Sequence, residues 1–353
     1  MTAKAPYRVP TMQEIAAIEP NGYNVISTFA GGGGSSLGYR MAGYRVLWAN
    51  EFIESARETY SANKANYTTV DGRDIREVTA TEILETVGIN KGDLDILDGS
   101  PPCASFSTAG KRHKGWGKVK RYSDGSQRTD DLFFEYARLV EGLRPKVFVA
   151  ENVSGLVKGS AKGYFLEILD DLKSKGYRVS AKLLDAQWLG VPQARQRLIF
   201  VGVRNDLGLP PVHPKPSSHR YSIRDAFIGL EEQEIDHITS ISKYAIGRYW
   251  DELKGPGYQQ HPKRFNLIKP DYDKPCPTIL ATGGNVGAAG VTHPKEKRKF
   301  TIAELKRICS FPDDYKPLGN YTQQWERMGR AVPPMMMRSI AQSVRTEILD
   351  KIK

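Results

Sequence analysis

The chain has 353 residues, enough for about two domains, and no apolar run reaches the roughly 20 residues that a membrane span needs. Its three cysteines lack C-x-x-C spacing, which argues against a thiolate zinc site and a disulfide framework, and we expect no bound metal. Lys and Arg exceed Asp and Glu by 51 to 40, giving a formal net charge of +11, which favours a polyanionic partner and above all nucleic acid.

The amino end, MTAKAPYRVP, holds no apolar secretory segment, so we expect a protein of the reducing cytoplasm. The first 200 residues alternate between β-rich runs and helical patterns. Strands are predicted at 24–29, 44–50, 94–99, 146–152 and 198–203, and helices at 52–63, 80–88, 132–143 and 163–176. We expect Thr129 or Asp130 to cap the third helix and Gly176 to end the fourth. This alternation predicts an α/β fold with a doubly wound, Rossmann-like sheet.

After Arg204 the pattern changes to short pieces rich in Pro and Gly. Regularity returns at 301–311, where Thr301 and Glu304 have capping-box spacing, and a last helix should begin near Pro333 or Pro334. We therefore predict an N-terminal tail at 1–22, a main domain at 23–204 that the C-terminal helix at 325–353 completes, and a smaller, irregular domain with a hinge at 205–324.

A run of four glycines follows the first predicted strand, in FAGGGGSSLG at 29–38. Such a loop lets the backbone approach a nucleotide-like ligand closely, but neither register of the glycines has the third small residue of a dinucleotide fingerprint. Glu51 ends the next strand, where an acid could bind ribose hydroxyls. These features favour a nucleoside cofactor without a pyrophosphate over NAD.

Three further features fall at strand ends: Cys103 behind two prolines, Glu151 at the close of an apolar strand, and the arginines of QARQR. Arg195 and Arg197 alternate, so both should lie on one face of a strand, and an antiparallel strand would begin at the edge that holds Cys103 and Glu151. Taken singly, the thiol could be a core residue, and the acid could belong to a structural Glu–Arg pair. Together, a thiolate that adds to C6 of cytosine and an acid at N3 would make C5 nucleophilic, on a base flipped out of the duplex.

With these motifs in order, nearly the whole chain resembles the cytosine-C5 DNA methyltransferases. FAGGGG resembles the family's F-x-G-x-G cofactor loop, SPPC its Pro-Cys nucleophile motif, ENV its acidic motif and QARQR its Q-x-R-x-R motif. The segment 298–315 resembles the late R-x-L-T-x-x-E-x-x-R-x-x-x-F-P motif, and RMGRAVPP resembles the closing G-N-x-V-P-P motif. The resemblance identifies 23–204 as a catalytic domain and 205–324 as a target-recognition domain with its hinge.

The resemblance implies S-adenosyl-L-methionine as cofactor and double-stranded DNA as substrate. It makes Cys103 the nucleophile and Glu151 the partner of N3, with Arg195 and Arg197 supporting the flipped base. The implied cofactor-binding residues are Phe29, Gly31, Gly33, Glu51, Phe52, Asp74, Ile75, Pro102, Leu132, Arg330, Ala331 and Val332. The basic segment after Cys103 would be a mobile loop over DNA, with candidate contacts from Ser107, Lys111, Arg112, Lys114, Lys118, Lys120 and Arg121.

Three positions depart from the family pattern. Ala104 stands where Gln is usual, Arg330 where Asn is usual and Phe300 where Leu is common. With Ala104, a polar contact near the flipped base is in question. With Arg330, the detail of part of the cofactor pocket is in question. A zinc deaminase is excluded because no His is followed by x-Glu, and Phe106 stands where its second Cys would be.

Two alternatives stay open: a tRNA cytosine-5 methyltransferase of the same family, and a catalytically disabled DNA-binding relative. The resemblance to bacterial and phage modification enzymes implies a monomer in the cytoplasm, associated with the nucleoid through DNA, with a cognate restriction endonuclease as a genetic partner. The DNA sequence that it recognises cannot be read from 205–298, because base contacts depend on loop conformation.

Overall fold

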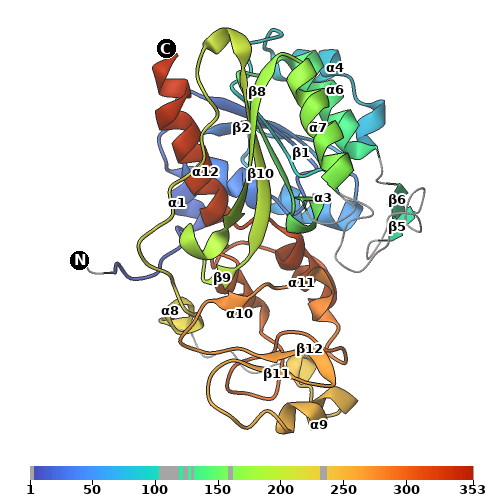
Figure 1. Cartoon of the computed structure of the whole chain (residues 1–353), viewed down its shortest axis with the longest axis vertical. Helices are drawn as coiled ribbons and strands as arrows, with labels where there is room; N and C mark the ends of the chain where they lie inside the picture. The colour runs from blue at the N-terminus through green and yellow to red at the C-terminus, as the bar shows by residue number, and fades with distance from the viewer. Residues whose placement is uncertain are drawn as a thin grey trace. The chain divides into compact units, whose positions relative to one another are not determined.

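The computed structural model describes residues 4–102, 119–121, 126–128, 131–157, 162–230 and 237–352. Its centre is a seven-stranded sheet in the order β3-β2-β1-β4-β7-β10-β8 (Figure 1). These strands are β1 (Asn24–Thr28), β2 (Arg45–Asn50), β3 (Thr69–Asp71), β4 (Ile96–Gly99), β7 (Val147–Val153), β8 (Tyr177–Asp185) and β10 (Gln196–Arg204). The pairs from β3 to β7 are parallel and β10 is antiparallel to β7. The doubly wound α/β prediction is confirmed.

Helices cover both faces of this sheet. On one face, α4 (Ala80–Val87), α6 (Leu132–Leu143) and α7 (Lys162–Ser174) bury an apolar cluster that includes Leu97 of β4 and Phe148 of β7. The other face carries α2 (Gly34–Met41), since the neighbouring residue in β4, Asp98, points the opposite way, towards α2. Tyr44 packs against Tyr39 of α2 and donates to a carbonyl of α12 (Pro334–Glu347). The strand ends therefore emerge from a three-layer core.

The five strands and four helices predicted in the first 204 residues are all present, with ends shifted by no more than a few residues. β3 and β8 were not foreseen: β3 has only three residues, and the alternation of apolar and polar residues in β8, YRVSAKL, was a signal that the prediction missed. The predicted cap of α6 is wrong: Asp131 occupies the N-cap position and makes no side-chain cap bond. Its carboxylate is engaged by Arg76 instead.

The rest of the chain forms shorter elements. The helices are α1 (Met12–Ala16), α3 (Glu54–Asn63), α8 (Ile223–Phe227), α9 (Ala245–Asp251), α10 (Ile302–Ile308) and α11 (Tyr321–Arg330). The strands are β5 (Val119–Arg121), β6 (Ser126–Arg128), β9 (Gln193–Ala194), β11 (Gln259–His261), β12 (Arg264–Lys269) and β13 (Cys276–Pro277). The predicted capping box of Thr301 and Glu304 starts α10, and α12 starts at Pro334 as expected.

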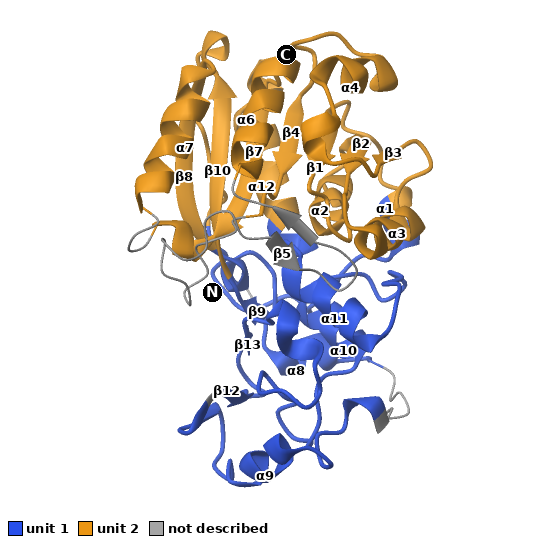
Figure 2. Ribbon diagram, turned by 90° about the vertical axis from the view of Figure 1, so that its right-hand side faces the viewer, with its two compact units in different colours: residues 1–15, 185–195, 216–336 blue, residues 16–184, 196–215, 337–353 orange. Residues whose placement is uncertain are grey.

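The chain divides into two compact units, coloured separately in Figure 2. One contains the sheet and comprises residues 16–184, 196–215 and 337–353, and we call it the sheet unit. The other, which we call the irregular unit, comprises 1–15, 185–195 and 216–336. Its boundaries differ from the predicted domains, since it includes 185–195, part of the predicted tail and the segment 325–336. Within the described residues, no helix is long and apolar enough to cross a membrane.

Candidate active site

The glycine loop is held at the end of β1 by the acid that ends β2. Phe29, Gly31 and Gly33 all have positive φ, so the chain turns sharply before α2. The N–H of Gly31 donates to Glu51 Oε2 at 2.7 Å, and the N–H of Ile53 donates to Glu51 Oε1 at 2.8 Å. A carboxylate has about four acceptor positions, so an acid anchored in this way can also accept a hydrogen bond from a ligand hydroxyl. A Cβ placed on Gly31 would meet no atom within 4 Å, so the loop borders open space.

Phe52 follows Glu51 and is 36% exposed, so its ring is accessible to a ligand at this edge. A buried carboxylate anchored to a glycine loop, with an exposed aromatic ring beside it, fits the ribose and base of a nucleoside. The residues at this edge of the sheet unit are therefore compatible with S-adenosyl-L-methionine.

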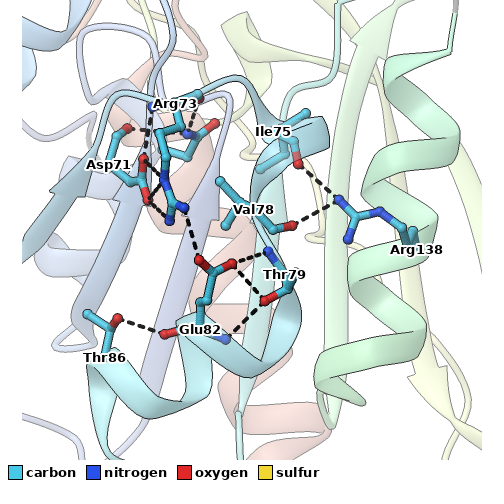
Figure 3. A network of polar contacts seen from close by, with 9 residues as sticks. Asp71, Arg73, Ile75, Val78, Thr79, Glu82, Thr86 and Arg138 are labelled. Carbon is cyan, nitrogen blue, oxygen red and sulfur yellow. Dashed lines mark hydrogen bonds and ion pairs between the residues drawn. The ribbon is translucent and has the colours of Figure 1, made fainter.

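The segment with Asp74 and Ile75 is fixed by a polar network (Figure 3). Arg73 pairs with Asp71 at 2.7 Å and with Glu82 at 3.0 Å. The guanidinium of Arg138 in α6 donates to the carbonyls of Ile75 and Val78 at 2.9 and 3.0 Å. This network ties the turn after β3 to α4 and α6.

Arg76 joins the same turn to the start of α6. Its guanidinium pairs with Asp74 at 2.9 Å and with Asp131 at 2.5 Å, and Asp74 also accepts the backbone N–H of Arg76. The side chains of Ile75 and Leu132 are 1% and 0% exposed and belong to the apolar cluster. They have a packing role here, and their part in cofactor binding remains a prediction.

Glu151 and Arg197 meet at the end of β7. β10 runs antiparallel to β7 with Glu151 opposite Ile199 and Val153 opposite Arg197, so the two charged side chains share one face. Arg197 Nε lies 2.6 Å from Glu151 Oε1, and both side chains are mostly buried. A buried carboxylate is costly in free energy unless an opposite charge or a hydrogen-bond donor pairs with it, and Arg197 is that partner. β10 therefore begins at the edge of the sheet that holds Glu151, as predicted.

The chain that leads to the predicted nucleophile is attached to this same edge. The side-chain amide of Asn152 donates to the carbonyl of Pro101 at 3.2 Å, and Pro102 is half-buried. Cys103 itself lies outside the described residues, as do Ser107, Lys111, Arg112, Lys114 and Lys118. For Lys120 and Arg121 only the backbone is described, in a short antiparallel pairing of β5 with β6.

Arg195 lies outside the strand that carries Arg197, which corrects the prediction that both stand on one strand. The strand is interrupted between β9 and β10, and Arg195 belongs to the irregular unit, whereas Arg197 belongs to the sheet unit. Its guanidinium is buried and donates to the carbonyls of Ile279 at 3.1 Å and Gly329 at 2.8 Å. Alternation predicts a common face only within one unbroken strand.

The closing motif lies at the end of α11, also in the irregular unit. Arg330 pairs with Glu326 at 2.7 Å, Ala331 is half-buried and Val332 is 5% exposed. Arg330, which departs from the family pattern, is thus engaged by an acid one helical turn earlier. In the described part of the chain, no group of three or more His, Cys, Asp or Glu could hold a metal ion.

Sequence reasoning missed Asp98, an acid in the middle of the sheet. It is 2% exposed, and burial raises its pKa to about 7, although hydrogen bonds from Ser27 and Tyr39 act in the opposite direction. The signal was present in LDILDG, where an acid interrupts an apolar strand.

Comparison with known proteins gives independent evidence about the family of this chain. Residues 23–346 match the family model described as C-5 cytosine-specific DNA methylase. The chain is 30% identical to Type II methyltransferase M.PspPI of Psychrobacter sp. (strain TA137), over 94% of this chain and 81% of that protein. It is 31% identical to Type II methyltransferase M.NgoFVII of Neisseria gonorrhoeae, over 91% of this chain and 86% of that protein.

Two solved structures show the same fold. A prophage-encoded DNA modification methyltransferase of E. coli has a TM-score of 0.70 at 20% identity and covers 92% of this chain and 99% of its own. A mutant of Spodoptera frugiperda DNMT2 has a TM-score of 0.66 at 19% identity and covers 94% of this chain and 99% of its own. At these identities, the likeness concerns the fold alone.

Proposed function

The chain belongs to the family of C-5 cytosine-specific DNA methylases and is a DNA cytosine-5 methyltransferase, and from this we propose its specific reaction and site. It transfers a methyl group from S-adenosyl-L-methionine to C5 of a cytosine that is flipped out of a specific duplex sequence. Two contacts at one edge of the sheet carry this proposal. Glu151 pairs with Arg197, and the next residue, Asn152, donates a hydrogen bond to the carbonyl of Pro101, two residues before Cys103.

In the proposed reaction, the Cys103 thiolate adds to C6 of cytosine and forms a C6–S bond, while Glu151 binds N3. Arg197 orients the Glu151 carboxylate through its close ion pair. S-adenosyl-L-methionine supplies an electrophilic methyl group when bound, and C5 accepts it. The proton at C5 then passes to solvent, the electron pair of the C5–H bond re-forms the C5=C6 double bond, and the C6–S bond breaks to release the Cys103 thiolate.

The cofactor is proposed to bind at the glycine loop, with Glu51 accepting hydrogen bonds from the ribose hydroxyls. Phe52 would stack on one side of the adenine, and the turn with Asp74 and Ile75 would border it. Glu51 is already fixed by two backbone N–H groups, so the site is pre-organised and little ordering is required on binding.

We propose residues 205–324 as the target-recognition region and the basic segment at 111–121 as a phosphate-binding loop. We also propose that the protein is a cytoplasmic, nucleoid-associated monomer with a cognate restriction endonuclease as its genetic partner. Arg195 is proposed to support the flipped base indirectly, by fixing the backbone around Ile279 and Gly329.

Covalent trapping on DNA that contains 5-fluorocytosine tests the reaction. Fluorine at C5 prevents the final elimination, so the wild-type protein should form an adduct that survives denaturation and requires S-adenosyl-L-methionine. Cys103→Ala should form none. Cys276→Ala is the matched control and should still form the adduct, because Cys276 is buried in the irregular unit and burial raises the pKa of its thiol.

Sequencing of the trapped DNA would give the recognition site. An adduct on fluorinated tRNA but not on DNA would overturn the DNA assignment in favour of the RNA branch. Absence of an adduct on either would indicate an inactive relative, and the proposed roles of Cys103 and Glu151 would then be wrong.

A further inference from the structure

The β11–β12 hairpin of the irregular unit is a short two-stranded ribbon with an exposed tip (Figure 1). Its strands are antiparallel, with His261 opposite Arg264 across the turn. Both turn residues, Pro262 and Lys263, are exposed, and so is Arg264. From 259 to 269 the chain contains three Lys or Arg and no acid. The ribbon therefore has a basic tip that is open to a large anionic partner.

The base of the ribbon is held in place within its own unit. Ile268 of β12 donates its backbone N–H to the carbonyl of Gly290 at 3.1 Å, and its carbonyl accepts the backbone N–H of Thr292 at 2.9 Å. The Thr292 hydroxyl donates to the same carbonyl at 3.0 Å and accepts from Trp250 Nε1 at 3.1 Å. Leu267 is fully buried in a small apolar cluster that includes residues of α9. Backbone bonds and packing thus fix the strand that carries the tip.

A buried histidine fixes the tip itself. The His261 side chain is 1% exposed, and its Nδ1 accepts the backbone N–H of Arg264 at 3.1 Å. Because Nδ1 is an acceptor, the proton of the neutral ring lies on Nε2, which donates to Glu252 Oε2 at 2.8 Å. The ring also packs edge-on against Tyr249 of α9, with centroids 5.0 Å apart. One side chain therefore connects β11, β12 and α9 at the residue where β12 begins.

The Arg264 side chain is oriented but has no acidic partner. Its guanidinium lies over the Tyr249 ring, with Cζ 5.1 Å from the ring centroid, which is a cation–π contact. Among the described residues no carboxylate pairs with it, whereas Arg224, Arg307 and Arg330 of the same unit each have one. Arg264 can therefore bind a ligand without first breaking an ion pair.

We propose that the β11–β12 ribbon enters the major groove of the substrate duplex and that Arg264 recognises a guanine there. The major groove of B-DNA admits a two-stranded β-ribbon, and a guanidinium donates two hydrogen bonds to O6 and N7 of guanine, the commonest base-specific contact. The inference rests on the proposed function, in which 205–324 is the target-recognition region. It names the element and the residue of that region that contact a base edge.

Binding selection from a library of randomised DNA duplexes tests the inference without turnover. The wild-type protein should enrich a sequence with G at a defined position, and Arg264→Ala should lose about tenfold of the selectivity for G at that one position. Arg264→Lys retains the charge but lacks the two-pronged donor, so it should lose the same selectivity.

Lys263→Ala is the matched control, because Lys263 is the neighbouring exposed cation in the turn. It should bind all sequences more weakly and keep the wild-type preferred sequence, as expected for loss of a phosphate contact. Since both side chains are exposed, we expect all three variants to fold, and urea unfolding verifies this.

Wild-type selectivity in either Arg264 variant would overturn the inference, because the contact would then not be to a base edge. A wild-type protein that enriches no sequence would overturn it as well. Trapping on 5-fluorocytosine DNA separates these failures from failure of the proposed function. If the wild-type protein still forms the Cys103 adduct on DNA, the proposed function stands and only the role of Arg264 is wrong; if it forms none, both fall.

Discussion

Two neighbouring residues show how differently this protein treats buried cations. Arg298 is 6% exposed and forms a salt bridge with Glu304 at 2.7 Å and with Glu296 at 2.9 Å, and these hydrogen bonds raise its pKa despite burial. Lys299 is fully buried, and its Nζ has no hydrogen-bond partner in the described part of the chain. Loss of hydration lowers the pKa of Lys299 to about 8. An uncompensated buried charge of this kind destabilises the fold.

Lys299→Met should therefore raise the free energy of unfolding at pH 7, because it replaces an unpaired ammonium with an apolar chain of similar length. Since the pKa of Lys299 is lowered in the folded state from 10.5 to about 8, wild-type stability should rise between these pH values, by at most about 3 kcal/mol from this group. Urea unfolding of both proteins across that range checks the sign. A gain that is absent at pH 7, or that grows above pH 9, would contradict the assignment.

The matched control is Lys306→Met. Lys306 Nζ donates to the carbonyls of Asp313 and Tyr315, so its replacement should lower the free energy of unfolding. The two lysine variants are thus expected to change stability in opposite directions.

At the scale of elements, helix starts in this protein are set locally. Among the described helices, α4, α8, α10 and α11 each begin with a capping box, in which the N-cap side chain and the side chain three residues later bind each other's backbone N–H. In α4 the box is Thr79 with Glu82, and Glu82 also pairs with Arg73 in the network of Figure 3. The same acid therefore starts α4 and braces the turn that carries Asp74.

Thr79→Ala should lower the free energy of unfolding by about 1 kcal/mol, as expected for loss of an N-cap side chain. Thr86→Ala is a suitable control in the same helix, because Thr86 Oγ only donates back to the Glu82 carbonyl at 2.7 Å and caps nothing. Chemical denaturation of the two variants measures the difference. If Thr79→Ala and Thr86→Ala lower the free energy of unfolding equally, the capping box does not determine where α4 begins.

At the scale of the whole molecule, part of the basic excess falls in the segment that we propose as a phosphate-binding loop. The segment KRHKGWGKVKR at 111–121 contains six Lys or Arg and no acid. Each phosphate neutralised by such a side chain releases counterions, so the number of contacts can be counted from the salt dependence of DNA affinity.

A triple variant, Lys111→Ala with Arg112→Ala and Lys114→Ala, should reduce the slope of log affinity against log salt by about 2.7 if each residue contacts one phosphate of duplex DNA. The control replaces three exposed basic residues of the sheet unit, Lys173, Arg178 and Lys182, with Ala. It should leave the slope close to that of the wild-type protein. A similar decrease in both variants would indicate a general charge effect and not a phosphate-binding loop.

The sequence by itself determined the features that depend on local chemistry. Alternating strands and helices predicted the doubly wound sheet, the spacing of Thr301 and Glu304 predicted the start of α10, and the motif order predicted the family. It also placed Glu51 and Glu151 at strand ends, because the ends of neighbouring parallel strands meet at one edge whatever the detail of the packing.

Only the tertiary structure decided which partner each polar side chain has. Arg195 and Arg197 are two residues apart, yet a break in the strand assigns them to different units and gives them different acceptors. The sequence shows Asp98 only as an acid that interrupts an apolar strand, and its raised pKa arises because the folded protein buries it. Hydrogen-bond partners and burial depend on contacts between residues far apart in the chain, and no local pattern encodes them.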